Sequence, residues 1–112
     1  GNPISSAACF RFFVYPYLFT ILNMKKEKPF KARLKYRFKK KKNFTRFLKG
    51  KLNSTKNGNL EIEILKGQES FKIKSFVKSN VWGVLKAGRS SFKKGHLIEC
   101  YSPLWSNKNI FL

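Results

Sequence analysis

The sequence predicts a mainly β fold that is preceded by an N-terminal helix. Three features predict it: apolar residues at helical spacing before residue 22, alternation of apolar and charged residues from residue 30, and turn-forming residues between the alternating stretches. With 112 residues, the chain has room for one small domain, or for one domain and a fragment of another.

The predicted helix begins at Pro3, because proline fits the first turn of a helix, where its missing N–H costs nothing. Phe12 and Phe13 lie opposite an apolar stripe, so we expect the helix to have neighbours on several sides. Pro16 is expected to kink the helix, or to end its first section, near residues 14–15. The stripe consists of Ala7, Phe10, Val14, Tyr17, Leu18 and Ile21.

The apolar N-terminal segment is long enough to be mistaken for a targeting or membrane-spanning sequence. Arg11 and Pro16 interrupt it, and it has neither a basic start nor a small-residue cleavage site. We therefore expect no membrane partner. The two lone thiols, Cys9 and Cys100, are typical of buried small hydrophobes in a reducing compartment, so we expect a cytoplasmic protein.

The clearest strand covers residues 30–38, where apolar positions alternate with lysine and arginine. This alternation predicts one buried face and one cationic face. A lysine-rich turn follows, and residues 44–52 predict a second strand. Its antiparallel return, residues 60–64, comes after a turn in which Asn57-Gly58 favours positive φ. The apolar face of the first strand consists of Phe30, Ala32, Leu34, Tyr36 and Phe38.

The second half of the chain alternates less regularly. Residues 67–77 predict a tight turn and then a short helix, and residues 81–86 predict a brief apolar strand. After a loop, residues 96–104 predict a last strand, in which either Leu97 or Ile98 faces inward.

The formal net charge is +20, from 25 basic and five acidic residues. Such a charge suggests nucleic-acid binding, because each phosphate that a basic side chain contacts releases counterions. The basic residues, however, are 20 Lys and only five Arg, whereas recognition of bases and phosphates favours Arg. Abundant Lys, Asn and Phe are also expected from an AT-rich genome. A small basic β-barrel nucleic-acid-binding module that uses Phe44, Phe47 and Trp82 is therefore kept only as the alternative.

The chain has no Asp, one histidine, His96, and two widely separated cysteines. These residues cannot form a zinc site or a Ser/His or Cys/His catalytic set, so we assign no metal ligand and no catalytic residue. Glu61 and Glu63 are better explained as cross-strand partners of basic residues than as a catalytic pair.

Several motifs follow one another along the chain: GNPIS, then F-x-x-x-V-Y-P, FTR near Phe44, GQES at Gly67, SFVKSNVWGVL at Ser75 to Leu85 and AGRSSFKKGHLIECY at Ala87 to Tyr101. Their order resembles that of the molybdopterin molybdotransferase family, the MoeA proteins of bacteria and the related gephyrin E domain. The chain departs from the family pattern at Ser79, Val81-Trp82 and Lys86. These departures concern active-site geometry rather than the fold.

The resemblance implies a bent antiparallel ribbon or partial barrel of the β-clip type, preceded by the helix. It also implies three parts: residues 1–24 as a helical remnant of a preceding α/β domain, residues 25–104 as the C-terminal β domain, and residues 105–112 as a tail. The chain would then be a C-terminal fragment whose apolar helix is covered by the part that precedes it.

The activity that the resemblance implies is insertion of molybdenum from molybdate into adenylylated molybdopterin, with Mg²⁺-assisted release of AMP. The expected partners are these two substrates and a second copy of the full-length protein, because the family's parent is a homodimer. We expect the Mg²⁺ ligands to lie outside this chain. The fragment alone is expected to bind no cofactor and to be inactive.

The resemblance also points to two groups of anion-binding residues. Gly1 and Asn2 could form a turn whose N–H groups face an anion at the start of the helix, next to Pro3. Ser5 matches the family serine, and either donates its hydroxyl to the anion or only caps the helix.

In the β domain, Arg46 and Ser70 match the F-x-R and G-x-x-S positions and are the expected residues of an oxyanion pocket. Arg46 suits this role because its guanidinium is always charged and presents five donors on a rigid fork. Residues 39–42, all lysine, could extend a positive funnel for the polyanionic substrate, or could simply be solvated.

Overall fold

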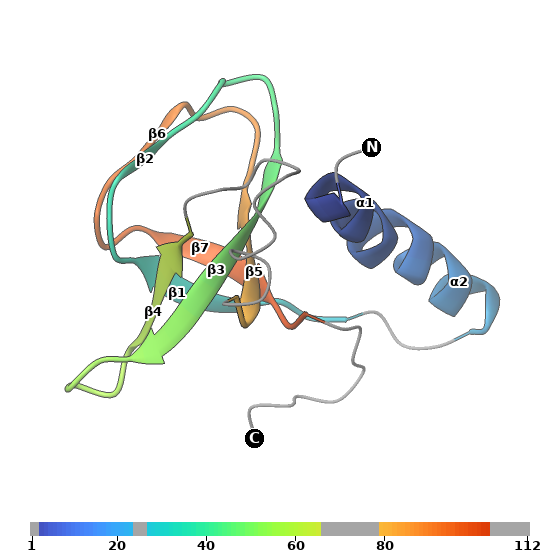
Figure 1. The fold of residues 1–112 in the computed structure, drawn as a ribbon, viewed down its shortest axis with the longest axis horizontal. Coiled ribbons are helices and arrows are strands. Elements are labelled where there is room, and N and C mark those ends of the chain that lie inside the picture. Colours follow the sequence, from blue (N-terminus) through green and yellow to red (C-terminus); the bar gives the residue numbers. More distant parts are fainter. Residues whose placement is uncertain (1–2, 24–26, 66–78, 104–112) are drawn as a thin grey trace.

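The computed structural model describes residues 3–23, 27–65 and 79–103 (Figure 1). It shows an N-terminal helical segment beside a small β-barrel, so the predicted mainly β fold with a preceding helix is confirmed. The turn and short helix predicted within residues 67–77 lie outside the described residues.

The helical segment has three parts that follow one another without a break. α1 (Pro3–Cys9) and α2 (Tyr15–Ile21) are α-helical, whereas η1 (Phe10–Val14) between them is π-helical. Pro16 lies in the first turn of α2. It has no N–H to donate, and in an unbroken α-helix its ring would clash with the carbonyl of the residue four positions earlier. The wider turn of η1, in which the Tyr15 N–H donates to the Phe10 carbonyl, precedes this proline. The predicted interruption near residues 14–15 therefore takes the form of a change in helix type.

Five strands form a closed barrel in the order β1-β4-β3-β5-β7. Four of the neighbouring pairs are antiparallel, and the fifth, β1 with β4, is parallel. This parallel pair completes a barrel that the resemblance predicts only as partial, and closure leaves no unpaired sheet edge. The strands are β1 (Phe30–Leu34), β3 (Arg46–Ser54), β4 (Leu60–Ile64), β5 (Val81–Leu85) and β7 (Leu97–Tyr101).

A second, two-stranded sheet joins β2 (Phe38–Lys39) to β6 (Ser91–Phe92) and arches away from the barrel on the side opposite the helix (Figure 1). The prediction of one continuous strand over residues 30–38 is wrong. The last hydrogen bonds of this segment to the barrel are those from the Leu34 N–H to the His96 carbonyl and from the Lys35 N–H to the Ile62 carbonyl, each 2.9 Å long; Phe38 then pairs with Phe92 of β6. The backbone turns out of the barrel here, so Tyr36 is 60% exposed instead of inward-facing.

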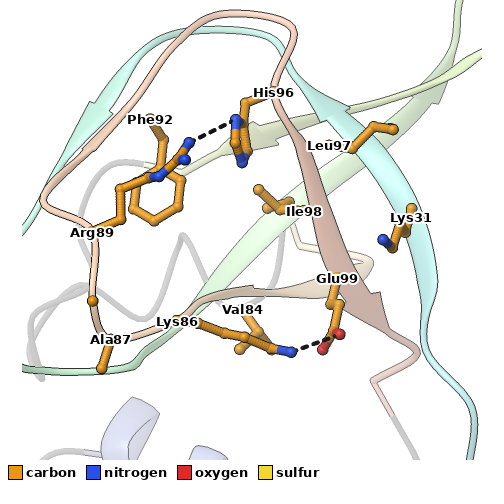
Figure 2. Close-up of a pocket in the computed structure, with 11 residues that line it drawn as sticks. Lys31, Val84, Lys86, Ala87, Arg89, Phe92, His96, Leu97, Ile98 and Glu99 are labelled. Carbon is orange, nitrogen blue, oxygen red and sulfur yellow. Dashed lines mark hydrogen bonds and ion pairs between the residues drawn. The ribbon is translucent and has the colours of Figure 1, made fainter.

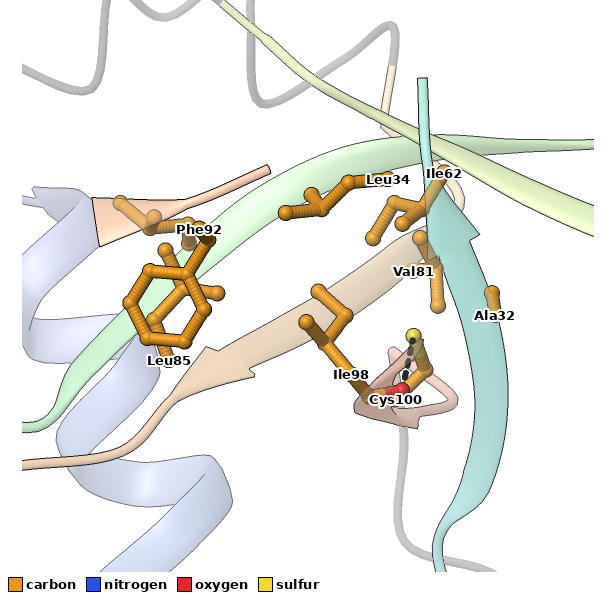
Figure 3. Close-up of a cluster of buried hydrophobic side chains, with 9 residues drawn as sticks. Ala32, Leu34, Ile62, Val81, Leu85, Phe92, Ile98 and Cys100 are labelled. Atoms are coloured by element: carbon orange, nitrogen blue, oxygen red, sulfur yellow. Dashed lines mark hydrogen bonds between the residues drawn. The ribbon is translucent and has the colours of Figure 1, made fainter. Parts of the chain in front are cut away.

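The core fills the barrel with the inward side chains of its strands, and Phe92 of β6 closes one end (Figure 3). Ile98 is 3% exposed and Leu97 is 46% exposed, so Ile98 is the residue of the last strand that faces inward. Cys100 is buried, and burial raises the pKa of its thiol to about 12, but Cys9 is exposed, contrary to expectation. The core consists of Ala32, Leu34, Leu48, Ile62, Val81, Leu85, Phe92, Ile98 and Cys100.

Two strand glycines, Gly50 and Gly83, allow Ile62 to approach the barrel backbone. A Cβ on Gly50 would lie 2.8 Å from Ile62 Cδ1 and 3.0 Å from the backbone oxygen of Glu63. A Cβ on Gly83 would lie 3.0 Å from Ile62 Cδ1. Both distances are shorter than ordinary van der Waals contact, so neither position has room for a side chain.

Gly50→Ala is expected to lower the free energy of unfolding by about 1–3 kcal/mol, because the added methyl must displace Ile62 and the β4 backbone. Urea unfolding measures this change. Lys51→Ala, on the exposed face of the same strand, is the control and should stay within about 0.5 kcal/mol of the wild type. Equal stabilities of the two variants would contradict the close packing at Gly50.

Candidate functional site

Only one of the six predicted anion-binding residues, Arg46, has a described side chain. The backbones of Pro3 and Ser5 belong to α1, but their side chains are not among those described. Outside the described residues lie Gly1, Asn2 and Ser70. The oxyanion pocket that would combine these residues therefore stays a prediction.

Arg46 is the first residue of β3 and pairs with Leu85 of β5, at the end of the barrel beside the arch. Its side chain is exposed, and its Cζ lies 5.8 Å from the centroid of the Phe38 ring. A guanidinium next to an aromatic ring is held in position without using its N–H donors. Those donors can therefore meet an oxyanion at the barrel end.

The segment between Phe38 and Arg46 contains the four consecutive lysines, residues 39–42, of which Lys39 ends β2, and it is anchored by hydrogen bonds. Lys40 Nζ donates to the Phe44 carbonyl at 2.6 Å, and the Gly88 N–H donates to the Lys42 carbonyl at 2.7 Å. Lys40 is thus a partly structural residue, whereas its neighbours in the run, Lys39, Lys41 and Lys42, are exposed. The structure places these exposed cations in the segment that leads from β2 to Arg46.

The helix packs on the outer face of the barrel through Phe12. The Phe12 ring stacks on Phe47 with centroids 4.3 Å apart, and it meets Trp82 and Tyr101 edge-on at 5.6 and 5.2 Å. The large residues of the predicted apolar stripe are exposed instead: Phe10 by 55%, Tyr17 by 67%, Leu18 by 46% and Ile21 by 61%. The sequence shows two apolar faces; on the smaller one the barrel covers Phe12, whereas Phe13 stays 60% exposed.

Charged side chains are buried where the helical segment meets the barrel. Arg11 is 2% exposed; its Nε donates to the Ser102 carbonyl at 2.9 Å and its Nη2 donates to Glu27 Oε1 at 2.5 Å. Lys49 is 3% exposed, and its Nζ lies 4.2 Å from the centroid of the Trp82 ring. Burial, together with the Arg11 charge, lowers the pKa of Lys49 from 10.5 to about 8.

This buried group was not predicted from the sequence. Arg11 is the signal that could have found it, because it is the only charged residue between Pro3 and Ile21. A charge within an apolar helix has to be paired or hydrogen-bonded when it is buried. The partner residues could not have been named, since Glu27 and Ser102 follow at separations of 16 and 91 residues.

The aromatic residues of the nucleic-acid alternative are not exposed together. Trp82 is 1% exposed and Phe47 is partly buried beneath Phe12, whereas Phe44 is 59% exposed. Stacking of bases requires exposed ring faces. The expectation of exposed rings is therefore wrong for Trp82, and the helix occupies the face of Phe47.

Residues 31–102 match the family model of the MoeA C-terminal region (domain IV). The fold is similar to the molybdopterin biosynthesis moeA protein of Pyrococcus horikoshii OT3, with a TM-score of 0.73 and 22% identity over 89% of this chain. It is also similar to a molybdenum cofactor biosynthesis protein of Pyrococcus furiosus, with a TM-score of 0.70 and 19% identity over 89% of this chain.

This chain spans 25% of the length of the first structure and 35% of the second. No curated protein matches its sequence. At such low identities, the likeness to the two solved structures establishes the fold.

Proposed function

This chain belongs to the family defined by the MoeA C-terminal region (domain IV), and on that premise we propose that it is part of a molybdenum cofactor biosynthesis enzyme. The reaction that we propose is insertion of molybdenum from molybdate into adenylylated molybdopterin. The observation that carries this proposal is the match of residues 31–102 to the family model, which covers the whole barrel except its first residue, Phe30.

Arg46 is the residue that we propose as the contribution of the barrel to substrate binding. Both substrates are anions, so bringing them together requires cations and N–H donors that offset their repulsion. Arg46 is exposed at the barrel end, is positioned by Phe38 and follows the lysine run 39–42. In this proposal Ser70 and the start of the helix, with Gly1, Asn2, Pro3 and Ser5, complete the anion-binding surface.

The described residues do not fit a magnesium site. Mg²⁺ is usually bound by carboxylate oxygens and water. Three of the five glutamates are already paired: Glu27 with Arg11, Glu63 with Lys35 at 3.4 Å and Glu99 with Lys86 at 2.8 Å. Within residues 3–23, 27–65 and 79–103, no group of three potential ligands lies together. We therefore assign the Mg²⁺ ligands and the catalytic residues to other parts of the enzyme.

We propose that the enzyme acts as a homodimer in the cytoplasm, and that this chain alone is inactive. The chain corresponds to about a quarter of the Pyrococcus horikoshii protein, so most of a protein of that size lies outside it. Within the described part of the chain, no helix is both long enough and apolar enough to cross a membrane.

A chimera tests the proposed role of Arg46. Residues 31–102 replace the matching region of a full-length MoeA protein, which is expressed in a bacterial strain that lacks its own MoeA. The chimera should restore molybdoenzyme activity, and Arg46→Ala should lower it about 10–100-fold, because two or more charge-assisted hydrogen bonds to an anion are lost.

Lys51→Ala in the same chimera is the matched control. It removes one positive charge from the same strand, but from its outward face, and should leave the activity within about twofold of the unsubstituted chimera. The proposed role of Arg46 is wrong if the two substitutions have the same effect.

A further inference from the structure

A pocket of about 400 Å³ lies on the outer face of the barrel (Figure 2). Its lining comes from β1, β5 and β7, and from β6 with the segments on either side of it. Arg46 is not among the described residues that line it. A volume of this size is typical of a site for one small molecule.

At one end of the pocket, Arg89 and His96 face each other above Phe92 (Figure 2). Arg89 Nη1 lies 3.3 Å from His96 Nδ1, and Arg89 Cζ lies 6.0 Å from the centroid of the Phe92 ring. Because a guanidinium has only donors, Nδ1 accepts in this contact and Nε2 carries the imidazole proton. The pair therefore presents an oriented guanidinium fork and an imidazole N–H.

The backbone on both sides of this pair is fixed by glycines with positive φ. Gly88, with φ of 100°, comes just before Arg89, and Gly95, with φ of 85°, comes just before His96. A side chain at either position would be strained. The two residues thus emerge from tight turns, and the contact between them does not depend on a long mobile loop.

The lining of the pocket carries an excess of positive charge. Its single acidic residue, Glu99, accepts a hydrogen bond from Lys86 Nζ at 2.8 Å, and this bond raises the pKa of Lys86. The ion pair with Lys86 neutralises the charge of Glu99, so the charges of Arg89 and Lys31 remain to attract an anion. Lys31 lies at the end of the pocket opposite Arg89 (Figure 2).

Between these cations the pocket has an apolar wall. Val84 and Leu97 line it from the outer face of the barrel, and Leu97 is 46% exposed. An exposed leucine next to exposed cations is suited to a ligand that has an apolar body as well as a charge. An inorganic ion would leave this apolar wall exposed to water.

We propose that this pocket binds a small organic phosphate. The phosphate lies against Arg89, whose side chain His96 orients, and the apolar body lies against Val84 and Leu97, on the side toward Lys31. A phosphate suits this end because the Arg89 guanidinium, which the contact with His96 orients, offers N–H donors to two oxygens of one group. The proposal does not depend on the proposed enzymatic function, since Arg46 is not involved.

The test uses the 112-residue chain, labelled with ¹⁵N, with phenyl phosphate and inorganic phosphate as probes at physiological ionic strength. We expect the largest amide shifts at residues 86–89 and 96–98, and a Kd for phenyl phosphate about fivefold lower than for inorganic phosphate, because the ring covers apolar surface. Arg89→Gln should raise both Kd values about tenfold. Arg37→Gln, at an exposed position outside the lining, is the control and should leave both unchanged.

Leu97→Ser separates the two halves of the site. It should remove most of the preference for phenyl phosphate while leaving the Kd of inorganic phosphate unchanged, and Arg46→Ala should change neither. The proposal is overturned if Arg89→Gln and Arg37→Gln behave alike, or if the shifts spread over the lysines of the whole surface. Failure of the chimera experiment would leave this result untouched, so the two proposals can fail separately.

Discussion

Arg11→Met is expected to lower the free energy of unfolding by about 3–5 kcal/mol, because it removes one partner of a buried ion pair. Glu27 would keep a buried carboxylate whose Oε2 already has no hydrogen-bond partner among the described residues, and the Ser102 carbonyl would lose the donor Arg11 Nε. The helix should detach from the barrel, since Arg11 and Phe12 provide its contacts with Tyr101 and Ser102.

Urea unfolding measures the loss, and Trp82 fluorescence in a Trp105→Phe background reports the detachment of Phe12. Arg37→Met, which removes an exposed arginine, should change stability by about 0.5 kcal/mol or less. The double variant Arg11→Met with Glu27→Leu should recover most of the loss, because no uncompensated charge is then buried. If Arg11→Met costs no more than Arg37→Met, the ion pair does not hold the helix in place.

The second large effect is a rise in stability with pH that depends on Lys49. Its pKa is about 8 in the folded chain, against 10.5 for an unperturbed lysine, because burial disfavours the ammonium and the Arg11 charge repels it. Between these two values the unfolded chain binds more protons than the folded one, so stability increases as the pH rises. Well below pH 8 the Lys49 amine is protonated in both the folded and the unfolded chain, so the cost of burying its charge does not change with pH.

Unfolding free energies at several values between pH 7 and pH 10.5 test this prediction, with Lys49→Met as the comparison. The wild type should gain up to about 3 kcal/mol relative to the variant over this range. The other lysines are common to both proteins, so their titration cancels in the difference. Parallel pH profiles would show that the Lys49 amine is not desolvated in the folded chain.

Local patterns in the sequence predicted most of the strands, and the reasons why they failed elsewhere are physical. The alternation of Leu60–Ile64 and the apolar run of Val81–Leu85 led to the observed β4 and β5. The same alternation extended the first strand to Phe38, because a pattern of side chains does not show that the chain leaves the barrel after Lys35 and then pairs with β6. The short sheet of β2 and β6 was also missed, because each of its strands has only two residues, too few to show an alternation.

For the candidate site, the sequence identified Arg46 through its resemblance to a family motif, and the structure adds its position at the barrel end beside Phe38. The pocket at Arg89 and His96 could not be predicted, because its lining comes from strands and loops that are far apart in the chain. In the sequence, the buried Lys49 also looks like an ordinary outward-facing lysine of a strand. Its neighbours Trp82, on another strand, and Arg11, on the helix, are far from it in the chain.

The sequence by itself determined the class of the fold, because alternation and helical spacing are local properties that a chain carries wherever it packs. It also predicted neighbours on several sides of the helix, since Phe12 and Phe13 lie opposite another apolar stripe, and the structure shows the barrel as one of them. Only the tertiary structure decided that Phe12 packs on the barrel, that β1 and β4 close it as a parallel pair, and that Arg11 and Lys49 are buried beneath the helix. These are contacts between distant segments, and their energy depends on which surfaces meet rather than on any residue's neighbours in the chain.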